Sequence, residues 1–174
     1  MIDYGDCMFM TYSYHGVTND TLQDLKDLFL CRGRVTGLRP WHVSQNKVVQ
    51  RYLEFTDKAY LVMVAADLLL DKPQLNAMLE AAETHDVVGT SFMQEPGRCI
   101  HKDEDTVPGS CLVIKRGVLE SRPQGQWFFW GMPDPDDPLA RVSCDCNWFC
   151  GWVKEKGYSI AKVGRVGHMT LTTI

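Results

Sequence analysis

The 174-residue sequence has no long hydrophobic run, no excess of basic residues and no paired C-x2-C cysteine motif. Its apolar runs stay well below the ~18 residues of a membrane span, and its first residues lack the basic and apolar regions of a secretory signal. The net charge of -4 argues against broad binding to nucleic-acid backbones, which needs clustered lysine and arginine. We therefore expect a soluble, cytoplasmic protein without a membrane span.

The composition is that of a globular domain. Hydrophobic residues make up 45% and charged residues 23%, close to the averages for soluble domains, so we expect a single domain over residues 1–174. The seven cysteines are an odd number, which favours reduced thiols over a disulfide framework. Cys144, Cys146 and Cys150 cluster without the spacing of a structural zinc site, so buried, inert thiols are the simpler interpretation.

Strand and helix patterns alternate along the chain. Continuous apolar runs predict strands at residues 7–12, 59–66, 87–90, 110–115 and 158–163. Helical spacing predicts helices over residues 22–29, from Ser44 to Phe55, from Pro73 to Ala82, and from a Ser143 cap to Gly157. This alternation predicts a three-layer α/β/α fold with a mainly parallel sheet, whose ligands bind beyond the carboxyl ends of the strands.

Two residues beside predicted strand ends suit a divalent metal. Asp67 directly follows the apolar run 59–66, and its carboxylate suits Mg²⁺ or Mn²⁺ bridging diphosphate oxygens, although a turn or helix cap is the alternative. His168 follows the last predicted strand, and imidazole is the commonest metal ligand.

Three further positions carry candidate chemistry. Asp145 lies in the first turn of its predicted helix, where free N–H groups should lower its pKa and keep it ionised. Residues Thr11, Tyr12 and Ser13 end the first strand, where they would meet a nucleotide. Trp127 and Phe128 offer an apolar platform for a sugar face, with burial in the core as the alternative.

Three segments resemble, in order, the motifs of small bacterial and phage-type GT-A glycosyltransferases of the family-2 kind. The stretch from Ser44 to Asp67 is similar to an Arg-Asn helix followed by a strand ending in Asp-x-Asp. Residues 109–116 resemble the small-residue strand of the acceptor side. Asp145-x-x-x-Phe-Cys, Lys156-Gly-Tyr and Val166-Gly-His168 resemble the closing Glu-Asp-x-x-Phe-Cys, Gly-(Tyr/Phe)-x-Ile and Val-Gly-His motifs.

The resemblance implies a GT-A, Rossmann-like fold and transfer of a sugar from a nucleotide-sugar donor to an acceptor hydroxyl of a glycan, protein or other molecule. It implies Mn²⁺ or Mg²⁺ bound by Asp67 and His168, with Asp145 as the catalytic base. It also places Asn46 and Ala65 on the donor side, and Gly109 and Ser110 on the acceptor side.

Three positions depart from the family pattern. Ala65 replaces the first Asp of Asp-x-Asp, Cys144 replaces the Glu before Asp145, and Gln45 replaces the Arg of Arg-Asn. These losses leave a non-catalytic domain that binds nucleotide sugars or glycans as one alternative. A nucleotidyltransferase is another, although residues 15–18 do not supply the Gly-rich, basic phosphate loop that it needs.

Overall fold

The computed structural model describes residues 2–13, 35–36, 41–66, 68–92, 106–123, 125–129 and 144–168. The helix predicted over residues 22–29, the Ser143 cap and Asp67 itself lie outside these ranges. No helix formed by the described residues is long and apolar enough to cross a membrane.

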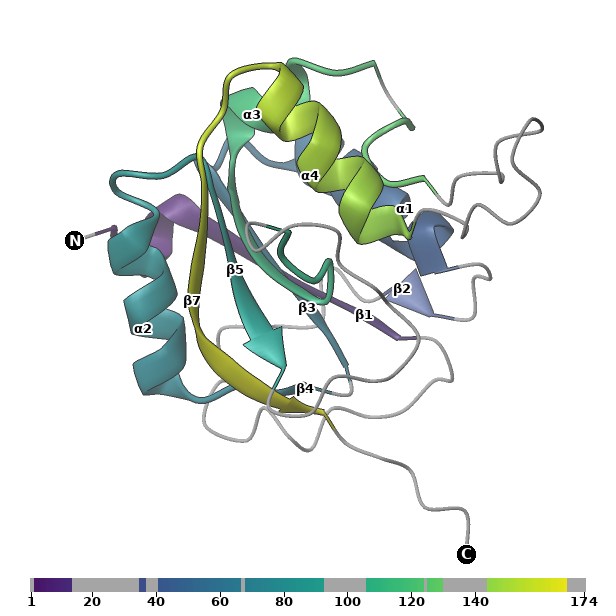
Figure 1. The fold of residues 1–174 in the computed structure, drawn as a ribbon. Coiled ribbons are helices and arrows are strands. Elements are labelled where there is room, and N and C mark those ends of the chain that lie inside the picture. The colour runs from purple at the N-terminus through teal and green to yellow at the C-terminus, as the bar shows by residue number, and fades with distance from the viewer. Residues whose placement is uncertain are drawn as a thin grey trace, which may run out of the picture.

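A central sheet runs through the described part of the chain (Figure 1). Its strands are β1 (Cys7–Ser13), β2 (Val35–Thr36), β3 (Tyr60–Ala65), β4 (Leu68–Leu69), β5 (Val87–Phe92), β6 (Cys111–Lys115) and β7 (Ile160–His168), in the order β2-β1-β3-β6-β5-β7-β4. β1 pairs in parallel with β2 and β3, and β5 with β7. β6 runs antiparallel between β3 and β5, and β4 runs antiparallel to β7. The predicted mainly parallel sheet is confirmed.

Helices cover both faces of the sheet. The described helices are a short 3-10 helix (Tyr4–Asp6), α1 (Trp41–Phe55), α2 (Lys72–Ala81), α3 (Arg116–Glu120) and α4 (Asp145–Glu155). Figure 1 shows α2 on one side of the sheet and α1 and α4 on the other. The structure therefore has the three layers expected from the alternation of strands and helices.

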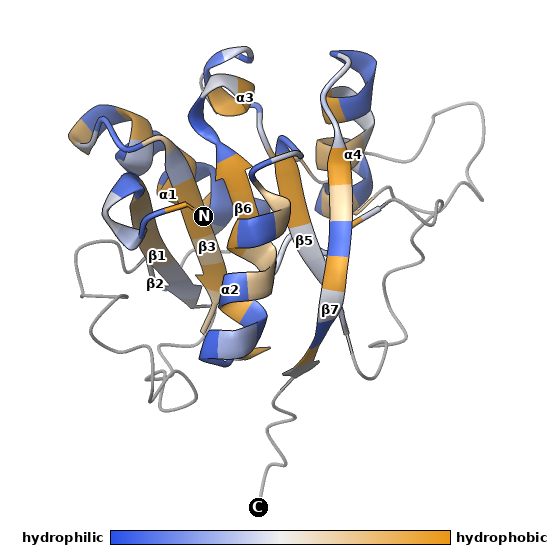
Figure 2. Cartoon of the chain, turned by 90° about the vertical axis from the view of Figure 1, so that its left-hand side faces the viewer, coloured by the Kyte–Doolittle hydropathy of each residue, from blue (hydrophilic) through white to orange (hydrophobic). Residues whose placement is uncertain are grey.

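Local chemistry explains where the elements begin and end. Residues 61–65 of β3 are all buried, as expected for a strand covered on both faces. Figure 2 shows β3 and β6 as largely hydrophobic, and β5 as hydrophobic in its first part. The Asp71 carboxylate accepts a hydrogen bond from the backbone N–H of Gln74 at 2.8 Å and caps α2. Gly157 adopts φ 82° just after α4, which favours glycine at this helix end.

Several boundaries differ from those predicted, and three of them are informative. α1 begins at Trp41, three residues before Ser44. The prediction missed this first turn because it lacks the apolar spacing that marks the rest of the helix. The N-cap of α4 is Cys144, which makes no side-chain capping bond, in place of the predicted Ser143. β7 continues through His168, which is therefore the last residue of the strand, because pairing with β4 extends the ladder.

Candidate active site

The carboxyl ends of β1 and β3 lie side by side and carry residues predicted for the donor side, and a residue predicted for the acceptor side, Ser110, bonds to the end of β3. Tyr12 is the β-ladder partner of Ala65, and the backbone N–H of Ala66 donates to the carbonyl of Tyr12 at 2.9 Å. The N–H of Ala65 donates to the carbonyl of Ser110 at 2.7 Å, just before β6 begins. The fold thus brings Tyr12, Ala65 and Ser110 together at one edge of the sheet.

Gly109 ties this edge to the helix layer. Its carbonyl accepts hydrogen bonds from the Tyr12 hydroxyl at 2.7 Å and from the Gln45 amide at 3.3 Å. Its N–H donates to Sγ of Cys146 at 3.2 Å. A Cβ atom at position 109 would lie 2.5 Å from Nε2 of Gln45, so a side chain there would displace the Gln45 amide from its bond to Gly109. Glycine permits the close approach that joins β1, α1 and α4.

Asp145, the predicted base, is the first residue of α4 and is only 4% exposed. Burial raises the pKa of its carboxyl to about 6, and the neighbouring Cys144 also raises it. Hydrogen bonds from the Gln45 side chain and from the backbone N–H groups of Cys146 and Asp145 lower this pKa by less. The predicted lowering of the pKa is therefore wrong, because loss of hydration outweighs the helix N-terminus.

The cysteines near Asp145 support the neighbouring loop. Besides the bond from Gly109 to Cys146, the thiol of Cys150 accepts a hydrogen bond from the N–H of Val107 at 3.4 Å. The same thiol lies 3.7 Å from the carbonyl of Val107, to which it donates. The described cysteines are buried and form no disulfide with one another. Cys146 and Cys150 thus hold the loop before β6 against α4.

The raised pKa of Asp145 predicts how the stability of the fold depends on pH. Unfolded Asp ionises near 3.8 and folded Asp145 near 6, so the fold loses stability as the pH rises from about 4 to about 6. Asparagine stays neutral, so Asp145→Asn should be more stable than wild type above pH 6, by up to ~3 kcal/mol, and should lose this advantage below pH 4. Urea denaturation between pH 4 and pH 8 measures the difference.

Asp86→Asn serves as the control with the opposite sign. Burial raises the pKa of Asp86, but hydrogen bonds from Ser159 and Lys115 outweigh it and hold the pKa below its usual value. Loss of this carboxylate should therefore destabilise the chain at neutral pH and matter less in acid. A gain in stability from Asp145→Asn that did not change with pH would contradict the raised pKa assigned to Asp145.

The contacts of Asn46 and of the aromatic segment after α3 do not match the ligand-binding roles predicted for them. The Asn46 amide donates to the carbonyl of Phe128 at 2.7 Å and accepts from its N–H at 2.9 Å, so it binds the backbone of this segment. Trp127 is 1% exposed, and Phe128 is fully buried and stacks on Phe149 at 4.6 Å. The predicted sugar platform of Trp127 and Phe128 is wrong, because a covered ring has no free face. Among the described residues of this segment, the exposed ring is that of Phe129.

Of the two predicted metal ligands, only His168 is placed, and only through its backbone. Asp67 lies outside the described residues, and His168 is described without its side chain. Antiparallel pairing of β4 with β7 sets His168 opposite Leu68, the residue after Asp67. A shared ion stays a prediction. At the end of β1, Thr11 is half-buried and Ser13 is described by its backbone alone, so their contacts with a nucleotide also stay predictions.

Gln45 plays a part that the sequence did not predict. In the sequence Gln45 stands out only as a departure from the Arg-Asn pattern, yet the side chain is fully buried and contacts both Gly109 and Asp145. A glutamine on the buried stripe of an otherwise apolar helix face was the available signal. Its Oε1 is buried and lacks a hydrogen-bond partner among the described residues.

Comparisons with known proteins identify the fold. No family model and no curated protein matches the sequence. A197 from STIV has a TM-score of 0.64 at 15% identity, over 93% of this chain and 85% of that one. Glucosyl-3-phosphoglycerate synthase from Mycobacterium tuberculosis, in complex with Mn²⁺ and UDP-glucose, has a TM-score of 0.52 at 11% identity, over 94% and 72%. The 2-C-methyl-D-erythritol 4-phosphate cytidylyltransferase of Francisella tularensis has a TM-score of 0.51 at 10% identity, over 94% of each chain.

These similarities place the chain in the class of α/β proteins with a Rossmann-like sheet. More specifically, the chain has the GT-A-like fold of nucleotide-sugar transferases, as its motifs predict. At such low identity the similarity defines the fold, and the reaction has to be argued from the site.

Proposed function

We propose that this chain transfers a sugar from a nucleotide-sugar donor to an acceptor hydroxyl with the help of a divalent metal ion. The observation that carries the proposal is Asp145, a buried carboxylate with a pKa of about 6 beside the carboxyl edge of the sheet. Sheets of this kind bind their ligands at that edge. The resemblance of Asp145 to the catalytic base of GT-A enzymes agrees with this position.

The raised pKa makes Asp145 a better base than an ordinary carboxylate. With a pKa of about 6 it is mostly ionised at pH 7 and still has appreciable proton affinity. In the proposed reaction the acceptor oxygen forms a bond to the anomeric carbon while the nucleoside diphosphate leaves. The hydroxyl proton passes to the Asp145 carboxylate. The Gln45 amide and two backbone N–H groups hold this carboxylate in place.

Asp67 and His168 would hold Mn²⁺ or Mg²⁺, which neutralises charge on the leaving diphosphate when bound. The backbone pairing of His168 with Leu68 supports this choice, because it sets position 168 across from the residue next to Asp67. The mycobacterial synthase was crystallised with Mn²⁺ and UDP-glucose. Thr11 and Ser13 would face the nucleotide, and Ser110 the acceptor. Tyr12 and Gly109 are buried and bond to each other, so they are supports of this edge and not the predicted ligand contacts.

Nucleotidyl transfer is the second candidate, because the cytidylyltransferase and the synthase have nearly the same TM-scores, 0.51 and 0.52. A non-catalytic binding domain is the third, favoured by Ala65 and Cys144 in place of family carboxylates. The buried side chain of Ala65 has no atom that can bind a metal or a ribose.

One product assay separates the three candidates. The chain is incubated with UDP-, GDP-, CDP- and dTDP-sugars, Mn²⁺ and a mixture of hydroxyl-bearing acceptors (glycans and proteins), and separately with nucleoside triphosphates and sugar phosphates. We expect a nucleoside diphosphate to form from one donor and its release to stop in EDTA. Pyrophosphate formation would instead identify a nucleotidyltransferase. Thermal stabilisation by a nucleotide sugar without any product would identify a binding domain.

A further inference from the structure

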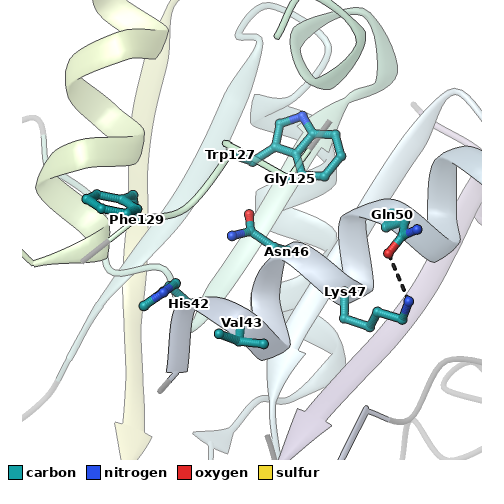
Figure 3. A pocket seen from close by; sticks show the side chains of 8 residues that line it. All are labelled: His42, Val43, Asn46, Lys47, Gln50, Gly125, Trp127 and Phe129. Atoms are coloured by element: carbon teal, nitrogen blue, oxygen red, sulfur yellow. Dashed lines mark hydrogen bonds between the residues drawn. The ribbon is translucent and has the colours of Figure 1, made fainter. Parts of the chain in front are cut away.

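A pocket of about 490 Å³ lies between α1 and the segment 125–129 (Figure 3). Its volume is within the range of small-molecule sites, which is roughly 300–1,000 Å³. His42, Asn46, Lys47 and Gln50 line it from α1. The buried residues Gln45, Val48, Val49 and Tyr52 occupy the opposite side of the same helix. The pocket is therefore separate from the Asp145 edge that Gln45 contacts.

The polar groups of the pocket suit a ligand that carries negative charge and hydrogen-bonding groups. Lys47 is the only charged residue among the described residues that line it, and its ammonium group donates to Oε1 of Gln50 at 2.9 Å. Burial lowers the pKa of His42, so its imidazole is neutral at pH 7. Nδ1 of His42 is buried and has no hydrogen-bond partner among the described residues.

Two exposed aromatic rings continue the pocket across the surface. Phe129 is 43% exposed and Trp148 is 37% exposed, and their ring centroids lie 5.3 Å apart. We call this pair the aromatic ridge. The His42 ring lies 5.9 Å from Phe129 at one end, and the Arg122 guanidinium lies 5.2 Å from the Trp148 ring at the other. The ridge thus runs from the Lys47 pocket to a second cation.

We propose that the pocket and the aromatic ridge form a binding site for a short anionic saccharide. The apolar C–H face of a sugar ring can pack on Phe129 and Trp148, as on other exposed aromatic side chains. Carboxylate or phosphate groups on the sugar would pair with Lys47 and Arg122, and hydroxyl groups would bond to His42 and Gln50. The site goes beyond the proposed transfer reaction, because it uses neither Asp145 nor the donor.

A saccharide fits these features better than a nucleic acid. The rings of Phe129 and Trp148 are inclined by 55° and lie too close together to admit a base between them. The net charge of -4 also disfavours a ligand with many successive phosphates. A short chain with few charges, one near each cation, matches the ridge in both shape and charge.

Calorimetry on the full chain, without nucleotide sugar or metal, tests this site. The probes are an oligogalacturonate, its neutral methyl ester, a phosphorylated oligosaccharide of similar length and a single-stranded oligonucleotide of equal charge. We expect one or both acidic saccharides to bind, and the better of the two identifies the anionic group. The neutral ester should bind roughly 10-fold more weakly, and the oligonucleotide more weakly than the acidic saccharides.

Substitutions on the ridge show where the probe binds. Phe129→Ala and Trp148→Ala should each weaken binding of the acidic saccharide by roughly 5–10-fold. Lys47→Gln should reduce the preference for the acid over the ester. Phe55→Ala, which removes a 78% exposed ring at the other end of α1, is the matched control and should bind as wild type does. Circular dichroism verifies the fold of each variant.

Three results would overturn the proposal. These are failure of both acidic saccharides to bind wild type, affinity that survives loss of both rings, and oligonucleotide binding as tight as that of the saccharides. None of these measurements contains donor or metal. Absence of saccharide binding would therefore not contradict the proposed transfer reaction. Inactivity in the product assay would likewise not contradict saccharide binding at the aromatic ridge.

Discussion

Replacing Asp145 with asparagine should lower kcat by ~10²–10⁴-fold and barely change donor affinity. The amide keeps the size of the carboxylate and can still accept the hydrogen bond from Gln45, but it cannot take up the acceptor proton. Steady-state kinetics with the donor found in the product assay give kcat, and calorimetry gives the Kd for that donor. In wild type, kcat/KM should rise through about pH 6 as Asp145 loses its proton.

The matched control is Asp86→Asn, which removes a carboxylate that pairs with Lys115 at 3.2 Å on β6. This variant should retain wild-type kcat, because Asp86 accepts hydrogen bonds from Ser159 and Lys115, which are not part of the candidate active site. Asp145→Asn should also abolish the rise of kcat/KM near pH 6. Wild-type turnover in the Asp145 variant would exclude this residue from the mechanism.

Replacing Asp67 with alanine should weaken nucleotide-sugar binding by at least ~10–100-fold when Mn²⁺ or Mg²⁺ is present, and have no effect in EDTA. Loss of a partner outside the ligand shell already costs a metal site about this much, so loss of a ligand should cost no less. His168→Ala should behave in the same way if both residues hold one ion. Calorimetry with and without EDTA measures the difference.

Asp71→Ala provides the control for Asp67. Asp71 caps α2 through its bond to the N–H of Gln74, so its loss should cost ~0.5–2 kcal/mol of stability without any metal-dependent loss of binding. If Asp67→Ala gave this same pattern, Asp67 would be a cap or turn residue. An equal loss of binding with and without EDTA would show that Asp67 supports the fold and holds no metal.

The order of the elements and several of their ends could be predicted from sequence because they depend on neighbours in the chain. The apolar run before Asp67 became β3, whose residues 61–65 are buried, and the spacing of Leu75, Met78 and Leu79 gave the buried face of α2. Asp145 fell in the first turn of α4 as expected. The motifs also identified the GT-A-like fold, because their order follows the order of the strands.

The sequence by itself determined the alternation of strands and helices, the buried runs and the presence of Asp145 at a helix start. Only the tertiary structure decided that Asp145 is buried, that its pKa rises to about 6, and that Phe129 is exposed where Trp127 and Phe128 are covered. The physical reason is distance along the chain. The hydration of a carboxylate or a ring depends on groups such as Gln45 and Gly109, which lie far away in sequence and meet α4 only when the sheet forms.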